Sequence, residues 1–472
     1  MYKSLKHHNY HFYHLILIII LYILNVYGQY VPENRYAHSA VYVRSESRIY
    51  FIGGFKVTPY VPNPMSDVFY LNINFTDANR LEFTDLTSQI NLPLTIFHDS
   101  ELGGVNKDLI FIIGGVNWKD PDTSHVYSLN TKTNELSVPI VQGKVPPSRK
   151  GMSSVIYEGK FYLFGGQAAT TGINTLYFND FNIFDTINLN WQVGSLVNSP
   201  TARILHSATI VNGVIYYIGG KTQVTVYPPL TEIYQYDIVG NTWSLKEATA
   251  ADPKFMPGSR AGHTSILIDG KIVIYGGFFS SDDIQNKLPA KETIAILDVN
   301  TLVWSIPEFD ARVDNPIPKL FLHTATAVGE VMFIAFGNFT DKPDGFDQTN
   351  KDIYIFVFGY PQIFSSSLSL IKNMANANEA QPQIPTSTNT NINPQQPSSL
   401  SKVVIVGISI GSVSLVLTIL SVLSIAHYKR TKKSKVQLGG VPNDPNSVEI
   451  NDDKSHSEYQ QQDPPTILTE SP

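Results

Sequence analysis

The sequence predicts an all-β fold, a six-bladed β-propeller, followed by one transmembrane α-helix. Three observations lead to this fold class: a glycine pair that recurs after short apolar runs, a histidine and a tryptophan that keep step with it, and one long uncharged apolar stretch near the C-terminus. The composition fits a packed globular part, because 43% of the 472 residues are hydrophobic and only 16% are charged.

The glycine pair is the primary signal of an internal repeat. Each copy ends a run of β-prone apolar residues, and the second glycines follow one another at intervals of 51 to 61 residues. A period slightly above about 50 residues is that of a four-stranded unit with long loops. We therefore expect six such units. The pairs are Gly53-Gly54, Gly114-Gly115, Gly165-Gly166, Gly219-Gly220 and Gly276-Gly277, with Phe336-Gly337 as a degraded sixth copy.

Two further positions keep a constant relation to the glycines. A histidine precedes the strand that lies upstream of each pair, except in the third copy, where Met152 stands. An aspartate lies six positions before a tryptophan in three copies, and Asn130 with Leu136 is a weaker version in the second. Because the chain has only 4 tryptophans, three at one repeat position form a specific signal. The repeat residues are His38, His98, His206, His263 and His323, and the pairs Asp185 and Trp191, Asp237 and Trp243, and Asp298 and Trp304.

These motifs resemble the kelch-repeat family over roughly residues 35–369. The resemblance implies that each repeat is one four-stranded antiparallel blade. Blades packed face to face around an axis bury the faces that a single blade would expose. The tryptophan position opens the fourth strand, so we expect its side chain to fill the space between blades. Aligning the last copy with the fourth predicts a local fourth strand over residues 363–368, and no strand from the N-terminus.

The two ends of the chain predict export and anchoring. Lys3 and Lys6 precede an apolar run of about 12 residues, which favours a cleaved signal peptide over a retained anchor. A second apolar stretch is long enough to span a bilayer, and basic residues follow it, so the N-terminal part is expected outside. The expected protein is a single-pass type I protein of the plasma membrane. Its segments are a signal peptide (1–28), the propeller (29–369), a disordered polar stalk (370–402), the transmembrane helix (403–426) and a disordered cytoplasmic tail (427–472).

The composition argues against several functions. A formal net charge of −6 does not suggest a nucleic-acid partner, and the absence of cysteine excludes disulfides, thiol catalysis and thiolate metal sites. Galactose oxidase carries similar repeats, but its copper site depends on a tyrosine cross-linked to a cysteine. We therefore predict a protein that is not an enzyme and has no cofactor or metal. The acidic loop residues Asp120, Asp122, Asp282 and Asp283 are interpreted as solvated.

The repeat histidines are interpreted as structural hydrogen-bonding groups, because one repeat position holds five of the 12 histidines. Four arginines that precede the same strands are interpreted in the same way, with contact to a ligand as the alternative. These are Arg35, Arg149, Arg203 and Arg260.

Two kinds of short motif concern modification and self-association. Asn74 and Asn338 each open an Asn-x-Thr sequence, so both are predicted glycosylation sites. Gly407 and Gly411 give the predicted membrane span a small-residue face, which would allow a homodimer.

The favoured function is extracellular recognition of a protein or a glycan, with the bilayer contacted through residues 403–426. One alternative is an enzyme that uses a central pocket, which would need polar residues at the axis beyond those the repeat requires; the sequence shows no such surplus. Another is a structural adhesion protein.

The turns between first and second strands are short, whereas the loops after the glycine pairs are long. Strand alternation puts these two classes on opposite faces, which we name the short-turn face and the long-loop face. Function usually resides on long loops carried by a rigid scaffold. The candidate ligand-binding residues on the long-loop face are Tyr60, Trp118, Tyr227, Phe278 and Phe279.

Overall fold

The computed structural model is all-β within the residues that it describes, with two 3-10 turns, η1 (Arg44–Glu46) and η3 (Pro253–Phe255), and no α-helix there. None of those residues forms a helix with the length and apolar character of a membrane span. The predicted signal peptide, stalk, membrane span with Gly407 and Gly411, and tail all lie outside the described ranges. These ranges are 30–58, 61–73, 81–169, 176–222, 226–280, 287–309, 317–341, 349–358 and 363–364.

Six antiparallel sheets follow one another along the chain, one for each repeat, and their strands pair in chain order. Blade 1 has β1 (Ser39–Val43), β2 (Arg48–Thr58), β3 (Val61–Asn72) and β4 (Glu82–Asp85); blade 2 has β5 (Thr95–Gly103), β6 (Leu109–Asn117), β7 (Val126–Asn130) and β8 (Leu136–Ser137); blade 3 has β10 (Ser153–Tyr157), β11 (Lys160–Phe164), β13 (Phe181–Asp185) and β14 (Asn190–Val193).

The second half of the ring repeats this plan. Blade 4 has β15 (Ser207–Val211), β16 (Val214–Ile218), β17 (Glu232–Asp237) and β18 (Thr242–Glu247); blade 5 has β20 (Thr264–Ile268), β21 (Lys271–Tyr275), β24 (Ile294–Asp298) and β25 (Val303–Ser305); blade 6 has β28 (Thr324–Val328), β29 (Val331–Ala335) and β31 (Ile353–Val357). Short strands in the connections are β9 (Arg149–Lys150), β12 (Gln167–Ala168), β19 (Thr249–Ala250), β22 (Phe278–Phe279), β23 (Leu288–Pro289), β26 (Glu308–Phe309), β27 (Leu320–Phe321), β30 (Asn338–Phe339) and β32 (Ile363–Phe364).

Burial explains why the second strand of each repeat is so apolar. In β16 and β21 every residue after the first is buried, because these strands lie inside their blades with a neighbouring blade on each face. The first strand of blade 4, β15, alternates buried and partly buried residues, because Ser207 and Thr209 bond to blade 5 whereas Ala208 and Ile210 pack toward blade 3.

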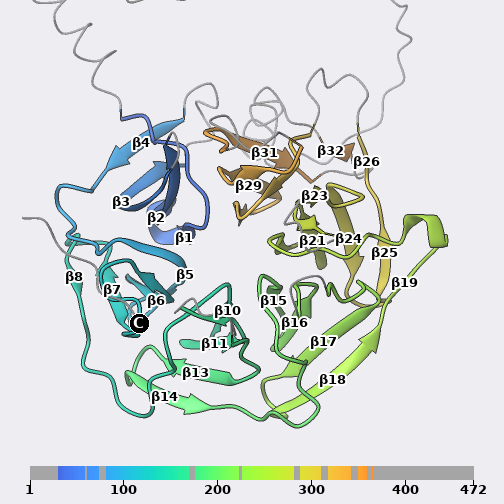
Figure 1. Ribbon diagram of the computed structural model, residues 1–472, viewed down its shortest axis with the longest axis horizontal. Helices are drawn as coiled ribbons and strands as arrows, with labels where there is room; N and C mark the ends of the chain where they lie inside the picture. Colours follow the sequence, from blue (N-terminus) through green and yellow to red (C-terminus); the bar gives the residue numbers. More distant parts are fainter. Residues whose placement is uncertain are drawn as a thin grey trace, which may run out of the picture. The chain divides into compact units, whose positions relative to one another are not determined.

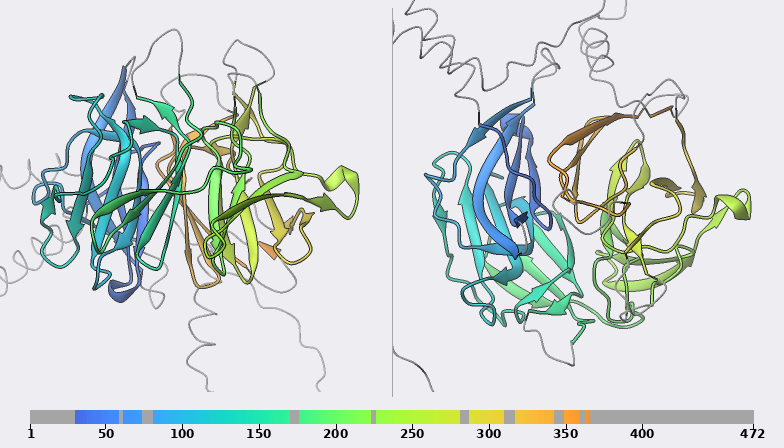
Figure 2. Two further views of the ribbon diagram at one scale, coloured as in Figure 1. Left: turned by 90° about the horizontal axis from the view of Figure 1, so that it is seen from below. Right: turned by 45° about the horizontal axis from the view of Figure 1, so that its top comes forward.

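The blades form a ring in chain order, so that the first and sixth are neighbours (Figure 1). Six hydrophobic clusters lie one between each pair of adjacent blades, and one of them joins blade 6 to blade 1 through Phe336, Phe51 and Phe69. Viewed from the edge, the strands of all blades run between the two faces of a disc (Figure 2). The predicted six-bladed propeller is confirmed.

The glycine pair and the repeat histidine keep step because they touch. A Cβ atom on Gly220 would lie 2.7 Å from the Cβ of His206 in the same blade, and one on Gly219 would lie 2.9 Å from the His263 ring of the next blade. Both glycines also have positive φ, +63° and +85°, which side chains other than glycine rarely tolerate. The pairs therefore leave room for the side chains at the repeat histidine position, Met152 in blade 3 included, and couple neighbouring blades.

The constant spacing of the repeat aspartate and tryptophan arises from the turn between the third and fourth strands. The Asp237 carboxylate accepts hydrogen bonds from the backbone N–H groups of Val239 and Gly240, both at 3.0 Å, and so closes the turn between β17 and β18. Asp185 and Asp298 do the same in blades 3 and 5, and Asn130 does so in blade 2. The tryptophan then follows the turn on the fourth strand.

A ring of backbone hydrogen bonds surrounds the axis where the first strands begin. The residue before each repeat histidine position has a positive φ in all six blades, although four of these residues are not glycine. In five of the six blades the N–H group of this residue donates to the carbonyl of the equivalent residue in the preceding blade. The bonds run from Ala37 to Leu322, Phe97 to Ala37, Leu205 to Gly151, Gly262 to Leu205, and Leu322 to Gly262, at 2.7 to 3.0 Å. The bond from Ala37 to Leu322 joins blade 1 to blade 6, and the residues that the structure describes include no strand shared by these two blades.

The predicted fourth strand of blade 6 is described only at β32. Its residues Ile363 and Phe364 pair in parallel with β26, and no pairing with β31 is present among the described residues. In blade 5 the fourth strand β25 likewise pairs in parallel with β19, a segment arriving from the preceding blade. β32 therefore has the partner expected of a fourth strand, while the rest of the predicted segment, 365–368, lies outside the described residues.

Candidate functional site

The five repeat histidines are enclosed by the fold, with exposed fractions of only 4% to 6%. Burial lowers their pKa values, to about 4 for His98 and to about 3 for His206 and His323, so they are neutral at physiological pH. Three of them hydrogen-bond through Nε2 to a hydroxyl on the blade before. These bonds join His38 to Thr324 (3.0 Å), His263 to Ser207 (2.9 Å) and His323 to Thr264 (2.9 Å).

The four repeat arginines lie inside the fold. Each is almost fully buried, and its Nη1 donates to the carbonyl of the first glycine of its own blade at 2.9 to 3.4 Å. Three guanidinium groups are also paired with carboxylates, Arg35 with Asp67, Arg149 with Asp180, and Arg260 with Glu292. These cations are therefore already engaged by the fold.

The three repeat tryptophans lie in the clusters between blades. Trp243 packs against Phe164 and Phe181 of blade 3, with ring centroids 5.2 and 5.1 Å away. Its indole N–H donates to the carbonyl of Ser195 at 2.7 Å, and that of Trp304 donates to Leu230 at 2.8 Å. Trp191 lies in the cluster between blades 2 and 3.

The predicted aromatic residues of the long-loop face differ in exposure. Trp118 is 51% exposed and rests edge-on against Phe55 at 5.7 Å. Phe278 is only 5% exposed, so the expectation that it presents a surface is wrong; it packs against Phe321 and Tyr227 instead. Tyr227 and Phe279 are partly buried, and Tyr60 lies outside the described residues.

The two glycosylation motifs also differ. Asn338 is 5% exposed and belongs to β30, a buried setting that does not favour the glycosylation predicted from the sequence. Asn74 lies outside the described residues, as do Asp282 and Asp283. Asp120 and Asp122 are both exposed, in agreement with the interpretation of these loop residues as solvated.

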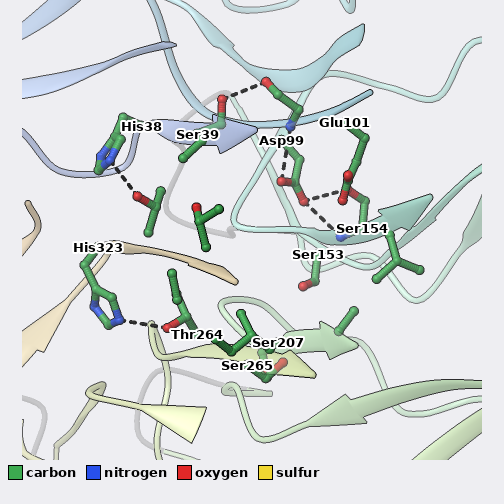
Figure 3. A pocket seen from close by; sticks show the side chains of 18 of the residues that line it. His38, Ser39, Asp99, Glu101, Ser153, Ser154, Ser207, Thr264, Ser265 and His323 are labelled. Carbon is green, nitrogen blue, oxygen red and sulfur yellow. Dashed lines mark hydrogen bonds between the residues drawn. The ribbon is translucent and has the colours of Figure 1, made fainter. Parts of the chain in front are cut away.

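An axial cavity of about 550 Å³ is lined by the first strands of all six blades (Figure 3). Its wall is rich in hydroxyl groups, because the residue after each repeat histidine position is serine or threonine in five blades. Several of these hydroxyls bridge neighbouring blades, for example Ser39 and Ser100, whose Oγ atoms are 2.7 Å apart.

Blade 2 departs from this pattern with two carboxyl groups. Asp99 stands where the other blades have serine or threonine, and Glu101 stands where they have Val41, Val155, Thr209, Ile266 and Thr326. Figure 3 shows both acidic side chains on the side of β5 that faces β10. The sequence-based statement that the axis carries no surplus polar residues is therefore wrong. Comparison of the six copies at these two positions, in place of their shared residues, would have revealed the surplus.

Hydrogen bonds from blade 3 stabilise the Asp99 carboxylate. It faces blade 3, the one blade in which Met152 replaces the repeat histidine, so the usual hydroxyl–histidine bond cannot form there. Its Oδ2 accepts hydrogen bonds from the N–H (2.9 Å) and Oγ (2.6 Å) of Ser154 instead. Burial nevertheless raises the pKa of Asp99, and burial together with the Asp99 charge raises the pKa of Glu101 to about 8.

Known proteins share this propeller architecture. The family model of the Attractin/LZTR1 β-propeller matches residues 110–369, more than half of the chain. The chain belongs to the Attractin/LZTR1 β-propeller family. Together with kelch relatives, this membership confirms the kelch-type propeller, a fold that typically serves as a protein-interaction module.

Curated relatives of this Attractin/LZTR1-type chain match it in part. It is 27% identical over 320 residues to acyl-CoA-binding domain-containing protein 4 of Arabidopsis thaliana, covering 66% of this chain and 44% of the relative. It is 27% identical to kelch domain-containing protein 3 of Bos taurus, covering 44% and 53%, and 26% identical to host cell factor 1 of Homo sapiens, covering 49% and 11%. The chain thus spans about half or less of these relatives.

One solved structure supports the fold alone. The structure of YjhT has a TM-score of 0.53 to this propeller at 12% sequence identity, and the match covers 71% of this chain and 98% of that one.

Proposed function

We propose that the chain is a recognition module that binds a protein partner through the long-loop face, at the outer surface of the plasma membrane. The observation that supports the proposal most strongly is the contrast between the buried repeat residues and the exposed Trp118. The buried repeat histidines and arginines are used inside the fold, whereas Trp118 remains 51% exposed on a loop after a glycine pair. Exposed tryptophan is characteristic of residues that anchor protein partners.

The neighbouring loops support this choice of face. Leu176, Val226 and Leu288 are exposed apolar residues on the corresponding loops of blades 3, 4 and 5. A partner seated across these loops would bury apolar side chains from several blades at once. The location rests on the sequence, in which the uncharged stretch 403–426 is followed by a basic cluster.

Cross-linking on intact cells tests both the location and the face. Cells expressing the full chain are treated with an amine-reactive reagent that does not cross membranes, which reaches the exposed Lys119 beside Trp118. We expect a cross-linked partner with the native chain and a loss of about tenfold or more with Trp118→Ala, as for a central interface residue. Val239→Ala is the matched control, because Val239 is 90% exposed on a turn of the short-turn face.

Two outcomes would contradict the proposal separately. Cross-links that form only with a membrane-permeant reagent would overturn the location. A product that survives Trp118→Ala but is lost with Val239→Ala would overturn the choice of face.

A further inference from the structure

The two axial carboxyl groups differ in how the protein satisfies them. Asp99 accepts two hydrogen bonds from Ser154 and one from the N–H of Ser100 at 3.2 Å. The Glu101 carboxyl has no hydrogen bond or ion pair with any residue that the structure describes. Glu101 is partly buried and lines the cavity, so the space beside its carboxyl is open to a ligand.

Nothing else in the cavity wall offsets a negative charge. The lining contains no lysine or arginine, and the histidines are held neutral by burial. The four repeat arginines point to glycine carbonyls and do not line the cavity. A ligand that satisfied Glu101 would therefore have to bring positive charge with it.

We propose that the axial cavity binds a cationic nitrogen group, an ammonium or a guanidinium, at the Glu101 carboxyl. The cavity volume of about 550 Å³ lies in the range typical of sites for small molecules. Ammonium and guanidinium groups carry several N–H donors, which suit a carboxylate surrounded by hydroxyl oxygens. A metal ion suits the site less, because the described residues contain no group of three or more metal-binding side chains.

This inference does not rest on the proposed function, since it concerns the axis and not the long-loop face. The cationic group has two possible sources, a small amine or a lysine side chain of another protein. Both present the same chemistry to Glu101, and the size of the probe distinguishes them.

Cation binding at this site is coupled to proton release. In the empty cavity Glu101 is mostly protonated at neutral pH, because its pKa is raised to about 8. A bound cation favours the ionised carboxylate. The affinity for the cation should therefore increase about tenfold for each unit by which the pH is raised toward 8, and should level off above pH 8. The other titratable groups that line the cavity are Asp99 and His98 on β5, His38 and Tyr42 on β1, His206 on β15, His263 on β20 and His323 on β28.

Calorimetric titration of the full chain tests the proposal with two probes, n-butylammonium and N-acetyl-lysine methylamide, between pH 6 and pH 9. Butanol serves as the neutral analogue. We expect saturable binding of at least one cationic probe, tighter at higher pH, and none of butanol. Glu101→Gln should weaken binding about tenfold or more and remove the pH dependence, since a charged hydrogen bond is lost. Glu247→Gln, at an exposed carboxyl on β18, should change neither.

The results with the two probes distinguish the two possible sources of the cationic group. Binding of n-butylammonium without binding of the lysine derivative indicates a small-amine ligand, whereas binding of the lysine derivative indicates a lysine side chain. Proton uptake and release, measured in two buffers of different ionisation enthalpy, provides a second readout if Glu101→Gln alters the fold. Equal binding of butanol, no binding of either cation, or unchanged affinity in Glu101→Gln would overturn the proposal.

Discussion

Replacing Trp243 by alanine should lower the free energy of unfolding by about 3 to 5 kcal/mol, the usual cost of truncating a large buried aromatic side chain. Trp243 is buried between blades 3 and 4, where its ring contacts Phe164, Phe181, Tyr217 and Tyr236. The substitution also removes the hydrogen bond to the Ser195 carbonyl. Both losses fall on the same junction between blades.

Chemical denaturation of the full chain, followed by circular dichroism, measures this effect. Trp118→Ala is the matched control, because Trp118 is half exposed and its removal should cost far less. A Trp243→Ala variant as stable as the native chain, or less affected than Trp118→Ala, would show that the repeat tryptophan does not hold the blades together.

Replacing Glu101 by glutamine should stabilise the protein at alkaline pH and not at acidic pH. Burial and the nearby Asp99 raise the pKa of Glu101 from 4.5 to about 8 in the folded state. Between these values the folded protein holds a proton that the unfolded chain releases, so this group costs more stability as pH rises toward 8, and the loss is complete above it. The full difference corresponds to roughly 5 kcal/mol, which is the upper bound of the effect because solvent in the cavity screens the charge.

The measurement is the free energy of unfolding of the native chain and of Glu101→Gln at pH 5 and pH 9. The difference between the two proteins isolates Glu101 from the other titrating groups. We expect the variant to gain stability relative to the native chain on going from pH 5 to pH 9, with Glu247→Gln showing no such gain. An identical pH dependence in all three would mean that Glu101 ionises as readily as an exposed carboxyl.

The ring of blades could be predicted from the sequence because its signals are repeated and local. The glycine pairs lie where the side chains of the repeat histidine position pack, and the aspartate accepts hydrogen bonds from the N–H groups of a turn, so these residues recur in step along the chain. The structural interpretation of the arginines follows from the same repetition, since each bonds to a glycine carbonyl of its own blade.

Exposure and departures from the repeat could not be predicted in this way. Phe278 and Trp118 both follow a glycine pair, yet only the contacts with Phe321 and Tyr227 decide that Phe278 is buried. Asn338 belongs to a sequence motif that says nothing of its burial. Asp99 and Glu101 were overlooked because the repeat was defined by what its copies share, whereas these two residues matter by what only blade 2 has.

Hydrogen–deuterium exchange of the full chain, with and without the cross-linked partner, tests the recognition surface most directly. We expect slower exchange on partner binding in the loops that follow the glycine pairs, residues 118–124 and 226–231, and no change in the turns at residues 157–160, 211–214 and 268–271. Protection confined to those short turns, or no protection on either face, would contradict the assignment of binding to the long-loop face.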